Sequence, residues 1–401
     1  MNYEETLSYI HSIPKFIRPL GNERLSALLE LLGNPQKKLR FIHIAGTNGK
    51  GSTAAMTAEI LQRGGYSVGL FTSPFIERFN ERIRVNGENI SDGALIEYAG
   101  KVKNIMETGG ALVSEFAFVT AVAFLYFCEM ECDFVVLEVG MGGKLDATNV
   151  IDESEVAVIC KIALDHTQYL GDTVEEITRE KCGIMRSNGI VVAYPNEKKI
   201  TDIIREHANK MNARLIIADK TAADGYELSL KGEYQRYNAA VVIEIVRALR
   251  DMGYDVPEDA VRDGLKNTKW AARFEFVRDN VIIDGAHNAD GIRALKESLA
   301  AVNKDITTVM AMMEDKAWEE CVKEIRPVAK RFIATELSMP RCLEAEKIAE
   351  IAGGAEVIKD VQSALSAAME DENSIVCVCG SLYLAGEARK YFNNRQNNAC
   401  K

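Results

Sequence analysis

Short apolar runs alternate with helical patterns along most of this chain, and this alternation restricts the possible folds more than any other feature. The runs are rich in β-branched residues and are nearly continuous. Strands of this kind are typical of parallel sheets that are buried on both faces, with the intervening helices as crossovers. The first two thirds contain six such runs, at 41–45, 67–71, 133–139, 155–162, 189–194 and 214–218. The pattern predicts an α/β fold with a mostly parallel sheet.

The last third of the chain shows the same alternation more clearly. Each gap between its strand-like runs has helical periodicity, which predicts a second, smaller, Rossmann-like α/β domain of doubly wound type. No G-x-G-x-x-G motif occurs there, so a dinucleotide cofactor is not expected. We expect domains at 1–269 and 270–401, with the junction within 267–277. The five strand-like runs are 280–285, 306–313, 331–335, 355–359 and 374–380.

Composition argues against several classes of function. The chain has 401 residues, too many for one ordinary domain, and a net charge of −11, which argues against a nucleic-acid-binding surface. No run of eighteen apolar residues is present to span a membrane, and the N-terminus does not read as a signal peptide. The nine cysteines form no C-x-x-C motif. We interpret them as reduced thiols, mostly in the core of a cytoplasmic protein.

The stretch FIHIAGTNGKGSTAAMTAEILQRGG, at 41–65, predicts a phosphate site. A glycine-rich turn follows a strand and precedes a helix, whose N-terminal N–H groups and dipole attract anions. Lys50 can reach the outer phosphates of a nucleotide. The hydroxyls of Ser52 and Thr53 can bind Mg²⁺.

The spacing of this loop differs from the commonest pattern, G-x-x-x-x-G-K-[ST], because Ile44 and Gly51 occupy the places of the first glycine and of the hydroxyl residue. A plain surface turn is the alternative, but so many Gly, Thr, Asn, Lys and Ser residues in one short loop favour ATP with Mg²⁺. The first domain is therefore expected to be P-loop ATPase-like. The loop residues predicted to bind the nucleotide are Gly46, Thr47, Asn48, Gly49, Lys50, Gly51, Ser52 and Thr53.

Seven segments, in order, closely resemble the folylpolyglutamate synthase and dihydrofolate synthase family of the Mur ligase superfamily, over about residues 1–390. They are HIAGTNGKGS, LFTSPFIERFNERIRVNGENIS, FVVLEVGMGGKLDATNV, LDHTQYLGDTVEEITREKCGI, LKGEYQRYNAA, WAARFE and DGAHNADG. The short-spaced loop is usual in that superfamily.

The resemblance implies an ATP-dependent ligase that makes an amide bond. ATP would phosphorylate the γ-carboxylate of a folate, or the carboxylate of dihydropteroate, and the amine of L-glutamate would attack the acyl phosphate. Such chemistry needs cations, metal ions and backbone donors around the phosphates. The resemblance further implies a monomer that has small-molecule partners and binds neither nucleic acid nor membrane.

Glu138 is the candidate metal ligand that the residues themselves indicate, because a carboxylate at the end of a strand beside a phosphate loop is placed to hold Mg²⁺. By resemblance, Ser73 and His166 complete a second Mg²⁺ site, beside the first at Ser52, and a monovalent cation can also bind. Taken without the family, His166 reads equally well as a core or general-base histidine, which Asp165 could orient.

Lys181, in REKCGI, reads by composition as a lysine on a helix surface. The resemblance implies instead that CO₂ converts it to a carbamate, which helps to organise the metal site. Lys50, Lys181, His166 and His287 are the expected catalytic residues.

The remaining site residues follow from the resemblance. Asn238, Arg273 and Asp284 are expected to contact the nucleotide. The expected substrate-side residues are Ser73, Phe75, Asp146, His287, Ser381 and Tyr383.

The chain departs from the family pattern at four positions. Phe75 and Tyr234 stand where histidine is usual, Ala289 replaces a proline, and Lys144 replaces an arginine. Phe75 bears on pterin recognition, since an aromatic ring can stack on a pterin but cannot donate the hydrogen bonds of an imidazole.

Two other functions stay open at this point. One is a ligase that joins an amino acid to a non-folate acid on the same scaffold. The other is an ATP-binding regulator without turnover, which the complete set of phosphate and metal residues disfavours. The sequence also leaves open whether the chain glutamylates folates alone or makes dihydrofolate as well.

Overall fold

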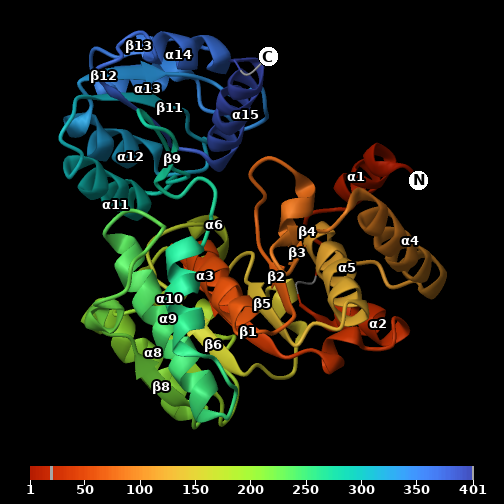
Figure 1. Ribbon diagram of the computed structural model, residues 1–401. Helices are drawn as coiled ribbons and strands as arrows, with labels where there is room; N and C mark the ends of the chain where they lie inside the picture. Colours follow the sequence, from red (N-terminus) through yellow and green to blue (C-terminus); the bar gives the residue numbers. More distant parts are fainter. Residues whose placement is uncertain (19–20, 400–401) are drawn as a thin grey trace. The chain divides into compact units, whose positions relative to one another are not determined.

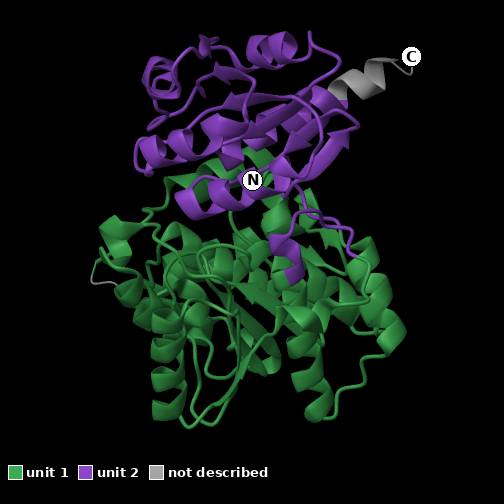
Figure 2. Cartoon of the chain, turned by 90° about the vertical axis from the view of Figure 1, so that its left-hand side faces the viewer, with its two compact units in different colours: residues 1–227, 237–268 green, residues 228–236, 269–401 purple. Residues whose placement is uncertain are grey.

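The computed structural model describes residues 1–18 and 21–399 (Figure 1). The chain divides into two compact units, residues 1–227 with 237–268 and residues 228–236 with 269–401 (Figure 2). The main boundary, between Thr268 and Lys269, lies within the stretch where we expected the junction. The segment 228–236 was expected in the first domain, but its contacts place it in the second unit.

The N-terminal unit is built on an eight-stranded sheet with the order β4-β3-β2-β5-β1-β6-β7-β8. The six predicted strands are confirmed and run parallel to one another. Continuous apolar sequences of this kind are typical of parallel strands. A short antiparallel hairpin, β3 and β4, extends one edge. The strands are β1 Phe41–Ala45, β2 Val68–Phe71, β3 Ile83–Val85, β4 Glu88–Asn89, β5 Phe134–Glu138, β6 Val156–Ile159, β7 Ile190–Ala193 and β8 Arg214–Ile217.

The helices of the N-terminal unit connect and cover these strands. α3, which follows the phosphate loop, contacts β1, β2, β5 and α10, while α7 contacts α8. The α-helices are α1 Tyr3–Ser12, α2 Glu23–Leu31, α3 Lys50–Arg63, α4 Asp92–Gly109, α5 Glu115–Glu129, α6 Thr167–Leu170, α7 Val174–Cys182, α8 Lys198–Lys210, α9 Tyr234–Asp251, whose first three residues belong to the other unit, and α10 Glu258–Asn267. Short 3₁₀ turns lie at η1 Pro35–Lys38, η2 Phe79–Arg82, η3 Ala147–Val150 and η4 Lys220–Ala223.

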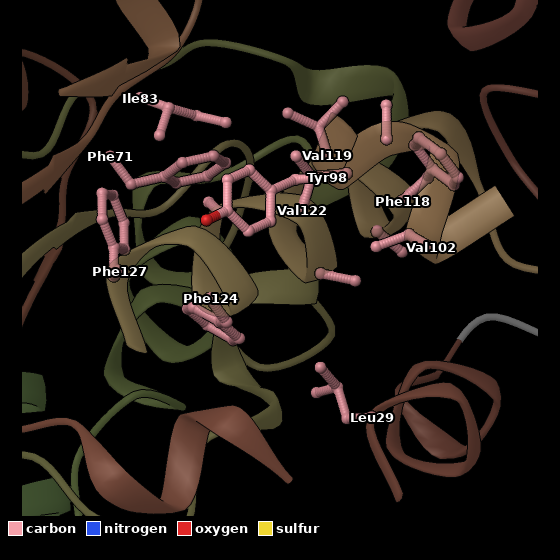
Figure 3. Packing of buried hydrophobic residues seen from close by; sticks show 14 of the residues in the cluster. Leu29, Phe71, Ile83, Tyr98, Val102, Phe118, Val119, Val122, Phe124 and Phe127 are labelled. Atoms are coloured by element: carbon pink, nitrogen blue, oxygen red, sulfur yellow. The ribbon is translucent and has the colours of Figure 1, made fainter. Parts of the chain in front are cut away.

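One large hydrophobic cluster lies where α1, α2, α4 and α5 meet the sheet. α5 is apolar on nearly all sides and most of its residues are buried, with Ser114 capping its first turn. Figure 3 shows Phe71, Phe124 and Phe127 in this cluster, and all three are fully buried. A second cluster joins β6 and β7 to α7 and α8. These two cores fix the positions of the loops that leave the sheet.

The C-terminal unit is a six-stranded sheet with the order β13-β12-β11-β14-β10-β9. All neighbours are parallel except β9, which pairs with β10 in the antiparallel direction. The strands are β9 Glu275–Arg278, β10 Val281–Ile283, β11 Ile306–Met310, β12 Arg331–Ala334, β13 Glu356–Val357 and β14 Ile375–Cys379. The helices are α11 Ala289–Ala300, α12 Trp318–Ile325 with η5 Arg326–Val328, α13 Ala345–Ala352, α14 Val361–Ala368 and α15 Leu382–Ala399.

This second unit confirms the predicted smaller α/β domain. α11 contacts α12, which contacts α13, whereas α14 contacts α15, and these two groups cover β11 and its neighbours. The eight cysteines among the described residues are all free, and six of them are buried, as expected; the ninth, Cys400, lies outside the described residues. Within the described ranges, no helix combines the length and the apolar character that a membrane crossing requires.

Candidate active site

Four loops that carry predicted site residues leave the same edge of the N-terminal sheet. They follow β2, β5, β1 and β6, which are consecutive neighbours in the sheet and run parallel. The carboxyl ends of parallel strands share one edge, which is where α/β sheets bind ligands. The fold therefore brings Ser73, Glu138, the phosphate loop and His166 to this edge.

The phosphate loop is held against the loop after β6. The backbone N–H of Thr47 donates to the carbonyl of Lys161 at 2.8 Å, and its hydroxyl donates to the carbonyl of Ala163 at 2.9 Å. Gly49 has φ 87° and caps α3, and a Cβ there would lie 2.5 Å from Oδ1 of Asn238. Only glycine suits both the backbone conformation and this close approach. Asn238 is buried beside the loop, where the sequence predicted a nucleotide contact.

Two lysine amines converge on one carbonyl group of this loop. Nζ of Lys50 donates to the carbonyl oxygens of Gly46 and Thr47 at 3.0 and 3.2 Å. Nζ of Lys181, on α7, donates to the same Gly46 oxygen at 2.9 Å. Lys181 is 4% exposed, so the interpretation of this residue as a surface lysine is wrong.

Burial changes the acid–base chemistry of Lys181. Loss of hydration, and second the positive charge of Lys50, lower the pKa of its amine to about 7, against the opposing effects of Asp165 and Asp146. About half of the Lys181 amines are therefore uncharged at pH 7, against well under 0.1% for an ordinary lysine. An uncharged amine is a nucleophile, whereas an ammonium group is not.

The candidate metal ligands are mainly oxygen donors. Glu138 is 5% exposed, and its Oε2 accepts the backbone N–H of Ser73 at 3.2 Å. Ser52, in the first turn of α3, is 2% exposed. Among the described residues no group of three or more His, Cys, Asp or Glu side chains could hold a metal ion. Few protein ligands and hard oxygen donors fit Mg²⁺, which keeps several waters and binds substrate phosphates.

His166 lies at the same edge but is exposed, in the left-handed region with φ 52°. Oδ1 of Asp165 accepts the backbone N–H of His166 at 2.8 Å, and this bond orients the loop. Nitrogen on Mg²⁺ is chemically unusual, and the oxygen donors above fit the ion better.

Asp146 is buried and its oxygens are bonded within its own loop. Oδ1 accepts the N–H and the hydroxyl of Thr148 at 3.0 and 2.6 Å, and Oδ2 accepts the N–H of Met141 at 2.9 Å. The Thr148 hydroxyl also bonds Nε2 of His43 at 2.9 Å. Burial lowers the pKa of His43 to about 3, so the imidazole is neutral. Thr148 and His43 thus support the loop that carries Asp146, a role that sequence reasoning missed although LDATN contains the threonine.

Phe75 is half-buried and packs against the hydrophobic cluster formed by α1, α2, α4, α5 and the sheet. Its ring centroid lies 5.8 Å from that of Phe79, and the guanidinium of Arg82 lies 5.4 Å from the Phe75 ring. These contacts hold the ring against Phe79 and Arg82, and its predicted place on the pterin side of the site stays a prediction.

In the C-terminal unit, Asp284 follows β10. Its Oδ2 accepts the N–H of Phe274 at 2.7 Å and its Oδ1 accepts the N–H of Ala286 at 2.8 Å. Burial raises the pKa of the carboxyl, and Arg273 opposes this rise. Nδ1 of His287 bonds the carbonyl of Gly285 at 2.8 Å. The predicted nucleotide residues Arg273 and Asp284 are thus neighbours within this unit.

Ser381 and Tyr383 lie at the end of β14 and the start of α15. Ser381 is 2% exposed and its hydroxyl oxygen accepts the N–H of Tyr383 at 3.2 Å. The Tyr383 ring is exposed. Ser381 therefore caps α15 locally, and its predicted contact with glutamate stays a prediction.

A surface cavity of about 560 Å³ lies on the face of α7 away from Lys181. It includes Lys144, one of the four departures from the family pattern, but none of the predicted catalytic residues. Its lining is Lys144, Tyr169, Leu170, Gly171, Glu176, Arg179, Glu180, Gly183 and His207. This cavity is separate from the phosphate loop, which lies at the sheet edge.

Comparisons with known proteins identify the family. The model of the Mur ligase middle domain matches residues 44–244, and that of the Mur ligase glutamate ligase domain matches residues 272–382. The chain is similar to the "Dihydrofolate synthase/folylpolyglutamate synthase" of Bacillus subtilis, with 34% identity over 97% of this chain and 98% of that one.

Solved structures give the same result. A structure of Escherichia coli FolC in complex with DHPP and ADP has a TM-score of 0.90 and 31% identity, over 99% of each chain. A bifunctional folylpolyglutamate synthase/dihydrofolate synthase from Yersinia pestis, complexed with AMPPNP and Mn ion, has a TM-score of 0.89 and 28% identity, over 98% of each chain.

Proposed function

The chain belongs to the folylpolyglutamate synthase and dihydrofolate synthase family of Mur ligases, and from this premise we propose a role for each part of its site. It is an ATP-dependent ligase that joins glutamate to a folate through an amide bond. The proposal concerns the residues, the metal ions and the range of acids that it accepts.

The first step is transfer of the γ-phosphoryl group of ATP to the carboxylate of the acceptor. Lys50 and the backbone N–H groups around Gly49 stabilise the charge on the phosphates, while Arg273 and Asp284 bind the nucleotide. The acyl phosphate is then attacked by the amine of L-glutamate. A C–N bond forms, the C–O bond to phosphate breaks, a proton leaves the amine, and ADP and phosphate are released.

Lys181 is proposed to carry a carbamate. Its neutral amine attacks the carbon of CO₂, a C–N bond forms and one proton is released to solvent, which leaves an anion. The observation that supports the carbamate is the buried amine of Lys181, which lies 2.9 Å from the Gly46 carbonyl oxygen and has a pKa of about 7. As an ammonium group, Lys181 adds a second positive charge beside Lys50; as a carbamate it balances that charge and supplies oxygen donors.

Ser52, Ser73 and Glu138 are the residues proposed to hold Mg²⁺, with His166 as a further ligand in the family pattern. The ions neutralise phosphate charge, which allows two anionic reactants to approach. The structure of the Yersinia pestis relative with AMPPNP and Mn ion supports the use of a divalent metal.

The acceptor is proposed to be tetrahydrofolate, at its γ-carboxylate, and also dihydropteroate. The name of the Bacillus subtilis relative includes both activities, and the Escherichia coli relative binds DHPP. The free cysteines support a reducing, cytoplasmic location. A monomer is expected, and light scattering of the purified protein tests this.

The test is a phosphate-release assay with ATP and Mg²⁺, in which tetrahydrofolate and dihydropteroate are offered separately, each with and without L-glutamate. Release is expected with either acid only when glutamate is present. Release that needs neither substrate, or that depends on a non-folate acid, would overturn the assignment. Release with tetrahydrofolate alone would restrict the enzyme to folylpolyglutamate synthesis. Lys181→Ala with full activity, or an unmodified lysine in the intact mass in bicarbonate, would exclude the carbamate.

A further inference from the structure

Tyr234 is the first residue of α9, and it lies in the segment 228–236 that joins the C-terminal unit. Its hydroxyl donates a hydrogen bond to Oδ2 of Asp284 at 3.2 Å. The family pattern has a histidine at this position, so this phenol–carboxylate bond belongs to the tyrosine of this chain.

The hydrogen bonds of Asp284 are distributed unequally between its two oxygens. Oδ2 accepts two hydrogen bonds, from the N–H of Phe274 and from the hydroxyl of Tyr234. Oδ1 accepts one, from the N–H of Ala286. Each carboxylate oxygen has about two acceptor sites. Oδ2 is therefore filled, and an acceptor site on Oδ1 is left for another donor.

The phenol is confined to this position. A Cβ at Gly232 would lie 2.7 Å from Cε1 of Tyr234, so the preceding turn closes directly over the ring. Burial raises the pKa of Tyr234 well above its usual value, and the charge of Asp284 adds to this rise. The hydroxyl therefore keeps its proton and acts as a donor throughout the neutral range.

We propose that Tyr234 is a positioning residue, which fixes the Asp284 carboxylate so that Oδ1 accepts a ribose hydroxyl of the bound nucleotide. This rests on the proposed nucleotide role of Asp284. Without the phenol, Oδ2 keeps only the Phe274 N–H, and the carboxylate can turn its acceptor site away from the ribose. The residue would thus affect recognition of the sugar more than phosphoryl transfer.

The test uses the full chain and measures the affinity for ADP, 2′-deoxyADP and 3′-deoxyADP by calorimetry. The wild-type protein is expected to bind one deoxynucleotide about tenfold more weakly than ADP, the effect of a hydrogen bond to a charged group. Tyr234→Phe, which removes only the hydroxyl, is expected to weaken ADP binding several-fold and to reduce that discrimination to about threefold or less. In turnover, KM for ATP should rise while kcat changes little.

Tyr237→Phe is the matched control, because Tyr237 lies on the same helix and its ring contacts Tyr194 and the Lys220 amine. It should leave the nucleotide affinities unchanged. Tyr234→Phe combined with Asp284→Asn should bind no more weakly than Asp284→Asn alone, since the phenol acts through the carboxylate. The comparison of the double variant with Asp284→Asn still tests the proposal if Tyr234→Phe alone lowers the amount of folded protein.

Unchanged discrimination in Tyr234→Phe, or a fall in affinity for all three nucleotides by the same factor, would refute the proposal. So would a wild-type protein that binds both deoxynucleotides as tightly as ADP, because Asp284 would then make no ribose contact. Failure of the ligase assignment would appear in a different measurement. Phosphate release would then not depend on both folate and glutamate, whatever the nucleotide affinities are.

Discussion

Replacing Lys181 with methionine removes a buried amine and keeps an unbranched side chain of similar length. In the folded protein the pKa of this amine is about 7, against 10.5 for an unperturbed lysine. The unfolded chain therefore binds more protons between pH 7 and pH 10.5, and the free energy of unfolding rises with pH across that window. Below pH 7 both states are protonated, and the full cost of burying the charge is present.

The size of this effect follows from the shift. A difference of about 3.5 pKa units corresponds to about 5 kcal/mol of destabilisation below pH 7. Between pH 7 and pH 9 that cost should fall by about 2 kcal/mol. Methionine loses the bond to the Gly46 carbonyl, worth about 1.5–3 kcal/mol for a charged donor, but that oxygen keeps the Lys50 amine as a donor.

Urea unfolding at pH 7, 8 and 9 in CO₂-free buffer measures the prediction. The wild-type protein should gain about 2 kcal/mol relative to Lys181→Met across this range. Lys198→Met is the control, because Lys198 is exposed and paired with Asp202, and it should follow the wild type. Added bicarbonate should stabilise the wild type and not Lys181→Met. Parallel pH profiles of the wild type and Lys181→Met would refute the reasoning.

Three further predictions concern the loop and the core. Lys50→Ala should lower phosphate release by roughly 10²-fold or more, through lost phosphate contacts, and near-normal turnover would mean that the loop is misassigned. Gly49→Ala places a methyl group 2.5 Å from Oδ1 of Asn238 at φ 87°, so it should weaken ADP binding in calorimetry and cost about 1–3 kcal/mol in urea unfolding; unchanged binding would contradict this. Phe124→Ala should cost about 3–5 kcal/mol in the same unfolding assay, since its ring is fully buried, with ADP affinity kept in the folded protein; a loss under 1 kcal/mol would show that the core refills the space.

The strands could be predicted where burial on both faces made their sequences continuous. Most parallel strands of both sheets have this character, although the edge strands β8 and β13 are more exposed, and each parallel strand lies within a predicted run. The hairpin of β3 and β4 was missed, although Asn86 and Gly87 have φ 50° and 79° and give the commonest signal for a two-residue turn. β9, a half-exposed edge strand that pairs antiparallel with β10, was missed because its alternating sequence resembles a loop.

The site could be predicted as a set of loops but not as a set of contacts. Its position as the last residue of a strand was enough to place Glu138 at the sheet edge. The environment of Lys181 could not be predicted, because its amine contacts the Gly46 carbonyl of the loop after β1 and its backbone lies against Gly143 of the loop after β5. A local helical pattern rich in charge cannot show such contacts. The bonds of Asp146 to Thr148 depend likewise on how the loop after β5 folds back.

The segment 228–236 makes the chain pass between its two units three times, after residues 227, 236 and 268. The order of synthesis therefore does not match the order of the units. When residue 236 leaves the ribosome, the first unit still lacks α10 and most of α9, while the segment carrying Tyr234 waits for a partner, Asp284, that has yet to be translated. Cutting the gene once at the main boundary would leave the second product without this segment. In a circularly permuted chain that begins at residue 228, the first unit would still be assembled from two separate parts. Residues 237–268 would lie near the new N-terminus and residues 1–227 at the new C-terminus.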